Sequence, residues 1–387
     1  MLSGMAGEGD AVAADRSANR DRAAIDDVEP DDDVEPDDDD IDAFDEDLWL
    51  DRISRKLGMG WLSDMLPGNI PPSYLYAVVT ITTLELVVGA YSYAMGEPII
   101  YLQNPFFVFQ PIALFAAVYG SRSLRRRYYH VMKEMRIDDR VDESERLTDI
   151  IPSWLPWTVF LSALAINYIR MFALGGPITI YREMNLAAVI GWTVSNPVWA
   201  SIATQFFAVY LSVELIAPRR LRNSDVGIDF LDPEGLGGLR PIGELIKHAY
   251  YYVVAGLIAF ALLLYGPAII GIEMERTAAT NIVFTAIWAG SIATVGYAVF
   301  TLHRFMRDEK RHELRRLKSI EQRLVENRWD IKRYVVSGED RDTVEELRRR
   351  MEMVSSTNEY PATFSIWSQL LLSIIIPKAT QLLVARI

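Results

Sequence analysis

Cysteine is the residue that this 387-residue chain lacks altogether. Its absence excludes disulfide bonds, iron–sulfur clusters, thiolate zinc sites and a cysteine nucleophile. Histidine is scarce: four copies stand singly, and none pairs with another at metal-ligand spacing. We therefore predict no metal site and no cofactor.

Sequence motifs of soluble enzymes are also missing. The chain contains no GxxxxGK(S/T) phosphate-binding loop, no HExxH zinc motif and no GxSxG nucleophile turn. No basic segment precedes a short apolar run at the N-terminus, so we predict no signal peptide. We predict neither enzymatic activity nor a nucleic-acid partner.

Negative charge is concentrated at one end of the chain. The first fifty residues hold 19 Asp and Glu but only 3 Arg, within a chain of formal net charge −13. This part includes the tandem VEPDDDVEPDDDD (28–40) and lacks the apolar residues needed to offset the entropy lost on folding. We predict that residues 1–44 form a disordered acidic tail. The tail either keeps a halophilic, archaeal-like protein soluble at high salt or binds a basic partner.

Long apolar runs dominate the rest of the sequence. Half of all residues are hydrophobic and the mean hydropathy is +0.10, and about 20 apolar residues suffice for a helix to cross a bilayer. We predict an all-α, polytopic membrane protein with a seven-helix transmembrane bundle. The seven predicted spans are 74–95, 105–120, 154–174, 186–216, 249–270, 282–303 and 363–384.

These spans organise the chain beyond the tail into four segments. Residues 45–71 are predicted to form an amphipathic juxtamembrane segment, which lies on the inner membrane surface or packs against the bundle. Residues 72–305 hold six transmembrane helices with cytoplasmic basic loops. Residues 306–360 form a cytoplasmic helical hairpin, because apolar residues recur there at heptad-like spacing. Residues 361–387 form the seventh transmembrane helix.

Lysine and arginine set the predicted orientation, because loops rich in these residues stay in the cytoplasm. Basic clusters follow the second, fourth and sixth spans, whereas the alternate loops hold at most one arginine each. We predict a plasma-membrane protein with a cytoplasmic N-terminus and an extracellular C-terminus.

Polar side chains at membrane depth are the candidate functional groups, since they are costly in lipid and face the bundle interior or water. Three interpretations stay open. The first is an ion pair of Glu85 with Arg170 or Lys378 that fixes the packing of the helices. The second is that the polar groups line an ion or solute path. The third is that Glu85 binds and releases a proton as part of proton-coupled activity. The candidates are Glu85 in the first span, Asn167 and Arg170 in the third, Asn196 and Gln205 in the fourth, and Gln369, Lys378 and Gln381 in the seventh.

Lys378 stands nine residues before the end of the chain, which is about 13 Å along a helix. A lysine at this depth either snorkels to the outer headgroups or belongs to a water-lined face. Gln369 and Gln381 share a broad polar side of the same predicted helix. A pore-lining seventh span is therefore one of the arrangements that the sequence allows.

The layout of residues 72–387 resembles the seven-transmembrane ion channel superfamily, which includes insect odorant and gustatory receptors. The similarity covers seven spans, an inside N-terminus, cytoplasmic extensions of spans four to six and a final helix that ends at the outer face. Thr363-Phe364 and Gln369 are loosely similar to the insect motif in that helix. The resemblance implies a tetrameric cation channel, with the last helix lining the pore and cytoplasmic helix ends anchoring the subunits.

Three functions stay open on the sequence. The first is a homo-oligomeric ion channel in the lipid bilayer. The second is a secondary transporter, with Glu85 and Arg170 in the solute site and Asn196-Pro197 as a helix break. The third is a membrane sensor or scaffold that holds a cytoplasmic protein through the hairpin or the acidic tail.

Overall fold

The computed structural model describes most of the chain beyond residue 47. The predicted acidic tail, residues 1–44, lies outside the described residues, as do Gln369 and Gln381. The structure describes residues 48–68, 70–97, 99–135, 137, 147, 150–183, 185–224, 226–272, 278–326, 335–336, 340–360, 368, 375–376 and 378–379.

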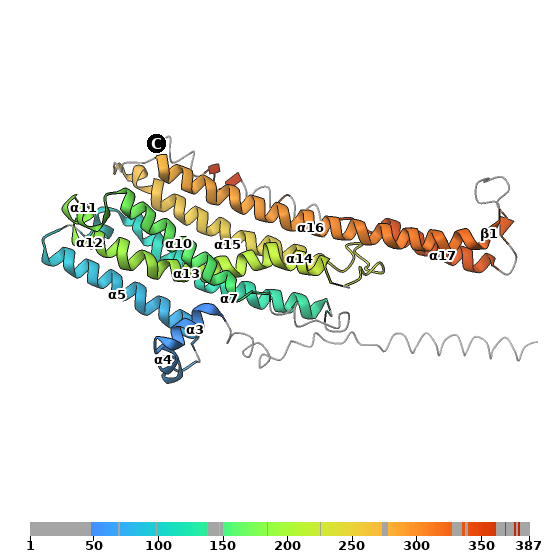
Figure 1. The fold of residues 1–387 in the computed structure, drawn as a ribbon, viewed down its shortest axis with the longest axis horizontal. Coiled ribbons are helices and arrows are strands. Elements are labelled where there is room, and N and C mark those ends of the chain that lie inside the picture. Colours follow the sequence, from blue (N-terminus) through green and yellow to red (C-terminus); the bar gives the residue numbers. More distant parts are fainter. Residues whose placement is uncertain are drawn as a thin grey trace, which may run out of the picture. The chain divides into compact units, whose positions relative to one another are not determined.

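Nearly all of the regular structure in these residues is helical (Figure 1). The helices and strands are α3 Trp49–Lys56, α4 Met59–Met65, α5 Pro72–Ala94, α6 Ile100–Gln103, η1 Pro105–Val108, α7 Phe109–Glu134, α10 Trp154–Ala173, α11 Gly176–Glu183, α12 Leu186–Ile190, η2 Gly191–Ser195, α13 Asn196–Leu211, η3 Ser212–Ile216, α14 Ala217–Arg222, α15 Arg240–Tyr265, η4 Gly266–Ile270, α16 Ala278–Leu324, β1 Val325–Glu326, β2 Val335–Val336 and α17 Arg341–Ser356.

Five of the helices are long and apolar enough to cross a membrane. The prediction of an all-α, multi-pass membrane protein is confirmed to this extent. The count of seven spans stays a prediction, because most of the last predicted span lies outside the described residues. The five candidate spans are Pro72–Ala94, Trp154–Ala173, Leu186–Arg222, Arg240–Ile270 and Asn281–Leu324.

The second predicted span does not lead into a loop. η1 and α7 continue from Pro105 to Glu134, so the basic segment that follows residue 120 is helical. The reason is a second apolar pattern, in which Leu124, Tyr128 and Met132 recur every four residues and are buried in the core. The prediction of a basic loop here was wrong, and α7 is not among the five candidate spans.

The continuous helix Leu186–Arg222 is the most buried of the five candidate spans. Its middle part, α13, packs against α3, α5, α7 and α10, and η3 packs against α15 and α16. Two π-helical turns, η2 and η3, interrupt its α geometry. Each ends two residues before a proline, Pro197 or Pro218, which has no N–H to donate to the preceding turn. The break expected at Asn196-Pro197 is thus a change of helical pitch within one helix.

The 47-residue helix α16 runs from the last candidate span into a hairpin with α17 (Figure 1). Between the two helices, β1 and β2 pair antiparallel, with Val325 opposite Val336. Leu317, Leu347 and Val354 form the buried cluster that joins α16 to α17. The two apolar seams visible in the sequence therefore contact each other.

The amphipathic segment at the start of the described chain packs against the helices. Trp49 and Leu50 of α3 are buried in one cluster with Ile202 of α13. The Trp49 ring meets the Trp157 ring of α10 edge to face, with 5.4 Å between the centroids. Packing on the bundle is thus observed for α3, whereas residues 45–47 and 69 of the predicted segment lie outside the described residues.

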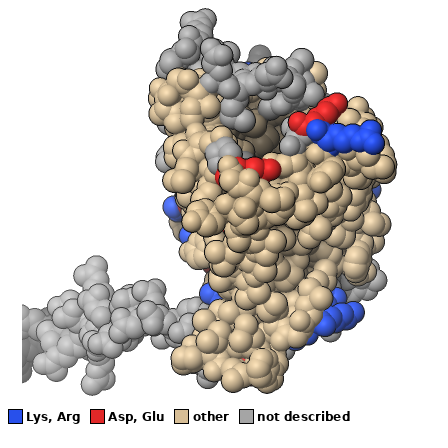
Figure 2. All heavy atoms as spheres, turned by 90° about the vertical axis from the view of Figure 1, so that its left-hand side faces the viewer, with Lys and Arg blue, Asp and Glu red and all other residues tan. Residues whose placement is uncertain are grey.

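Apolar side chains are exposed along the candidate spans. Leu86, Ile166, Phe172, Ile282 and Phe300 are each more than half exposed. Seen from the end that carries α11 and α12, the surface of the described residues is mainly uncharged (Figure 2). Single exposed apolar residues are ordinary in soluble proteins, but exposure repeated along helices of spanning length suits a hydrocarbon environment.

Candidate functional site

Two of the predicted polar residues meet at the first π turn. Nδ2 of Asn196 donates to Oδ1 of Asn167 at 3.0 Å, and Nδ2 of Asn167 donates to the Trp192 carbonyl at 2.9 Å. Pro197 offers no N–H to the carbonyls of η2, so a side chain from α10 supplies a donor in its place. The pair joins α10 to the continuous helix Leu186–Arg222, called the central helix from here on.

Two charged candidates, Arg170 and Glu85, have separate partners. Arg170 places its guanidinium over the Trp192 ring, with 5.4 Å between Cζ and the ring centroid. Glu85 accepts a hydrogen bond from the Tyr101 hydroxyl. Within the described ranges, no ion pair joins Glu85 to Arg170. Glu85 and Arg170 therefore do not link the first and third predicted spans in this structure.

Lys378, from the last predicted span, contacts the neighbouring helix α16. Its ammonium Nζ donates to Oγ1 of Thr285 at 3.3 Å and lies 5.7 Å from the centroid of the Trp288 ring. Thr285 is the fifth residue of the candidate span Asn281–Leu324. The lysine thus faces another helix inside an apolar stretch, as charged groups in membranes usually do.

Gln205 fixes the first described helix in place. Its side chain is buried, and Oε1 accepts from the backbone N–H of Leu50 at 3.0 Å. The first N–H groups of a helix have no partner within the helix, and the residue before α3 offers no side-chain cap. Gln205 supplies that acceptor from the central helix, so its role in this structure is the docking of α3.

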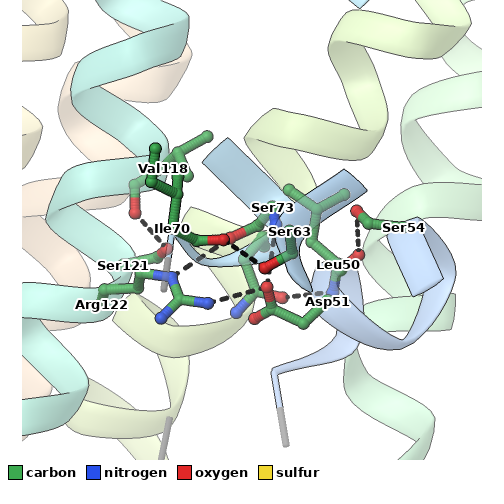
Figure 3. Close-up of polar contacts among 10 residues, drawn as sticks. Leu50, Asp51, Ser54, Ser63, Ile70, Ser73, Val118, Ser121 and Arg122 are labelled. Atoms are coloured by element: carbon green, nitrogen blue, oxygen red, sulfur yellow. Dashed lines mark hydrogen bonds and ion pairs between the residues drawn. The ribbon is translucent and has the colours of Figure 1, made fainter. Parts of the chain in front are cut away.

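A buried ion pair that sequence analysis missed lies beside this contact (Figure 3). Nη2 of Arg122 donates to Oδ1 of Asp51 at 2.7 Å, and Nε of Arg122 donates to Oγ of Ser73 at 3.1 Å. The backbone N–H of Ser73 donates to the same carboxylate oxygen at 2.9 Å. Asp51 is fully buried and Arg122 nearly so. The network ties together α3, α5 and α7.

The sequence carried only an indirect signal of this network. Arg122 stands two residues after the second predicted span, in the segment that its basic residues predict to be a loop. An arginine so close to an apolar run is buried only when a carboxylate pairs with it. Asp51 is the carboxylate, but a partner 71 positions away is not visible from local patterns.

Glu214 is a second group that sequence analysis missed. It lies in the π turn η3, is fully buried, and has no hydrogen-bond partner among the described residues on either carboxyl oxygen. The phenols of Tyr210 and Tyr250 lie within its electrostatic reach. The Tyr210 hydroxyl shares a hydrogen bond of 2.7 Å with Oγ1 of Thr294 on α16. A lone acid thus sits among hydroxyl groups from three helices.

The position of Glu214 explains why it was overlooked. It falls at the very end of the predicted span 186–216, where an acid is expected to reach water. The helix instead continues to Arg222, and α15 and α16 pack against η3. The available signal was the sequence VELIAP, which places a lone glutamate four residues before Pro218.

The loop between α14 and α15 connects the candidate spans to the hairpin. The backbone N–H of Asn358 donates to the Gly235 carbonyl at 2.7 Å. Phe230 of the same loop packs against the cluster formed by Leu317 and Leu347. The loop therefore contacts both sides of the boundary between the apolar helices and the hairpin.

Asp232 organises that loop. Its carboxylate accepts backbone N–H groups of Glu234, Leu236 and Gly238 at 3.0, 3.0 and 2.8 Å. Partial burial by itself raises the pKa of Asp232. The three backbone donors and the positive charge of Arg240 outweigh that effect and hold the pKa below its ordinary value. The carboxylate is thus stabilised in its ionised form.

The comparisons with known proteins give no family for this chain. No family model, no curated protein and no solved structure matches it. Among the described residues, no cluster of three or more His, Asp or Glu side chains is arranged to hold a metal ion. The function is therefore argued from the polar groups inside the candidate spans.

Proposed function

We propose that this chain is a channel-like membrane protein that conducts ions, assembled as a homo-oligomer with the last apolar segment beside the ion path. The protein crosses the plasma membrane seven times, through the five candidate spans, the apolar part of α7 and segment 363–384. Its N-terminus is cytoplasmic and its C-terminus extracellular. The mainly uncharged end near α11 and α12, and the basic residues in the second half of α7 and in the last turn of α14, support this orientation.

The observation that carries the proposal is the contact of Lys378 with α16. An ammonium inside an apolar stretch is costly, and such groups mark ion or solute paths in membrane proteins. Lys378 contacts the hydroxyl of Thr285 and lies over the face of Trp288. These two contacts join the last predicted span to the start of the candidate span Asn281–Leu324.

The test is current recorded from the purified protein in planar bilayers, with wild type and Lys378→Glu side by side. We expect discrete openings in both proteins and a raised cation-to-anion permeability ratio in Lys378→Glu, because the variant exchanges a positive for a negative charge at the path. The measurement is the reversal potential across a salt gradient.

Lys318→Glu is the matched control for this test. Lys318 is an exposed lysine of α16 in the hairpin, and the same charge change there should leave the permeability ratio as in wild type. An equal shift in both variants, or no shift in Lys378→Glu, removes Lys378 from the ion path. Folded protein that never carries current contradicts the channel itself.

A membrane sensor or scaffold is the second candidate, favoured by the contacts between the α14–α15 loop and the hairpin. These contacts connect the candidate spans with a charged surface suited to a protein partner. Cross-linking in native membranes tests this, with Arg349→Glu and Arg350→Glu on α17 compared with wild type. A partner captured by wild type and lost in the double variant supports a scaffold, and identical capture by both counts against one.

A further inference from the structure

We propose that Glu214 is a proton-binding site in the core of the protein, which exchanges its proton with water and makes the state of the central helix depend on pH. The ligand is the proton itself, and only the O–H bond of the carboxyl group forms or breaks. The inference stands on the surroundings of Glu214 and holds whether or not the chain conducts ions.

The first step concerns burial. Glu214 is fully buried, and in the part of the chain that the structure describes neither carboxyl oxygen has a hydrogen-bond partner. Moving an ionised carboxylate into such a site without a partner costs several kcal/mol, whereas the neutral acid loses far less on leaving water. The folded arrangement therefore suits the protonated acid, and ionisation requires a change in the surroundings.

The second step concerns the neighbours. The titratable groups that face Glu214 are Tyr210 on its own helix and Tyr250 on α15. From α16, which also packs against η3, the polar groups that contact Tyr210 are neutral: the Ser291 carbonyl at 3.4 Å and the Thr294 hydroxyl at 2.7 Å. No charged side chain of the described residues balances the carboxylate. The site holds hydroxyl donors for a transient anion but no cation to pair with it.

The third step concerns the backbone that carries the acid. Glu214 lies within a π turn, which contains one residue more than the α pattern and recurs at functional sites. Each added residue rotates the positions beyond it by about 100° around the helix axis. A change between π and α geometry at η3 therefore turns the carboxyl group relative to α15 and α16. This gives the acid a route from its buried position toward water.

The fourth step concerns access to solvent. Arg222 ends the same helix eight residues after Glu214, which corresponds to about 12 Å of helix rise. The arginines of α14 lie at that end, whereas the acid itself lies inside the packed helices. The α14 end is therefore the end of this helix from which we expect water to reach the carboxyl group when the surroundings rearrange. Glu85, by contrast, already has the Tyr101 hydroxyl as a partner.

Infrared spectroscopy of the full-length protein in lipid vesicles tests the proposal. Spectra are recorded from acid to alkaline pH for wild type, Glu214→Gln, Glu214→Asp and the control Glu85→Gln. We expect a carbonyl band of a protonated carboxyl group in wild type and in Glu85→Gln at neutral pH. This band should be absent from Glu214→Gln, shifted in frequency in Glu214→Asp, and lost reversibly as the pH rises.

Two outcomes overturn the proposal. If Glu214→Gln keeps the full protonated-carboxyl band, Glu214 is ionised in the folded protein. If the band belongs to Glu214 but does not change at any pH at which the protein stays folded, the acid is a fixed structural group. Should Glu214→Gln fail to fold, the frequency shift in Glu214→Asp assigns the band instead. These infrared measurements do not require channel activity, so they test the role of Glu214 even if no current is recorded.

Discussion

Nη2 of Arg122 lies 2.7 Å from Oδ1 of Asp51, although the two residues are 71 positions apart and both are buried. Ser73 completes the contact from a third helix, through its hydroxyl and its backbone N–H. The ion pair therefore locks α3 onto the helices that follow it in the chain.

Removal of one partner of this pair should destabilise the protein strongly. Asp51→Asn keeps the shape of the side chain but leaves the Arg122 charge in the core without its carboxylate. We expect a loss of about 3–5 kcal/mol in the free energy of unfolding. The measurement is chemical denaturation of the purified protein in detergent, followed by circular dichroism.

Asp308→Asn is the matched control for that prediction. Asp308 pairs with Arg304 at 3.7 Å on α16, where both side chains are about half exposed. Exposed pairs of this kind contribute less than about 1 kcal/mol. Similar losses of unfolding free energy in Asp51→Asn and Asp308→Asn would mean that the buried ion pair contributes no more to stability than the exposed one.

The two asparagines at the first π turn should behave as one unit. Asn167→Ala removes the donor to the Trp192 carbonyl and should cost about 1–3 kcal/mol, because a partly buried carbonyl loses its partner. Asn196→Ala should cost less once Asn167 is already alanine, with a coupling of at least about 0.5 kcal/mol. Unfolding of wild type, both single variants and the double variant measures this, and strictly additive losses would refute it.

The stability contributed by Asp232 should depend on pH with a defined sign. Its pKa is lowered in the folded protein, so its contribution is fully present above the ordinary value near 3.8 and is lost as the pH falls through the lower folded value. Asp232→Asn should therefore be less stable than wild type near neutral pH. The gap between the two should narrow in acid, and a gap that stays constant down to acid unfolding would contradict the lowered pKa.

Gly237 should not tolerate a side chain. Its φ is +68°, and a Cβ atom there would lie 2.5 Å from Cγ2 of Ile228. Gly237→Ala should lose at least about 1 kcal/mol from the left-handed backbone alone, before any cost of moving Ile228. Gly256→Ala is the control, because that glycine is helical and has open space around it. Equal unfolding midpoints for Gly237→Ala and Gly256→Ala would show that the turn at Gly237 accommodates a Cβ atom without loss of stability.

The apolar spans were predictable because a bilayer imposes a length and a composition that one sequence reveals. The two apolar seams of the hairpin were visible for a similar reason. Leu317 belongs to one series of apolar residues at helical spacing and Leu347 to another. The loop assigned after residue 120 failed because clustered arginines hid the burial of Leu124 and Tyr128. In that segment the spacing of the apolar residues, and not the charge, corresponds to the helix that the structure has.

Several of the polar residues that form contacts could be identified from the sequence, but the residues that they contact could not. Asn167 and Asn196 were both identified, yet their hydrogen bond depends on the π turn that precedes Pro197. Glu214 was missed because burial at the end of a span depends on how far α15 and α16 extend beside it. Such information resides in the packing of distant segments, which local patterns do not contain.

The length of α16 has a mechanical consequence. At 1.5 Å per residue its 47 residues extend for about 70 Å, more than twice the ~30 Å hydrocarbon thickness of a bilayer. Lys310 holds α17 alongside through the carbonyls of Ser355 and Thr357, at 2.8 and 2.7 Å. The pair therefore moves as one rigid arm, and a tilt of about 5° displaces a tip about 40 Å away by about 3.5 Å. Small rearrangements among the packed spans would thus be amplified at β1 and β2.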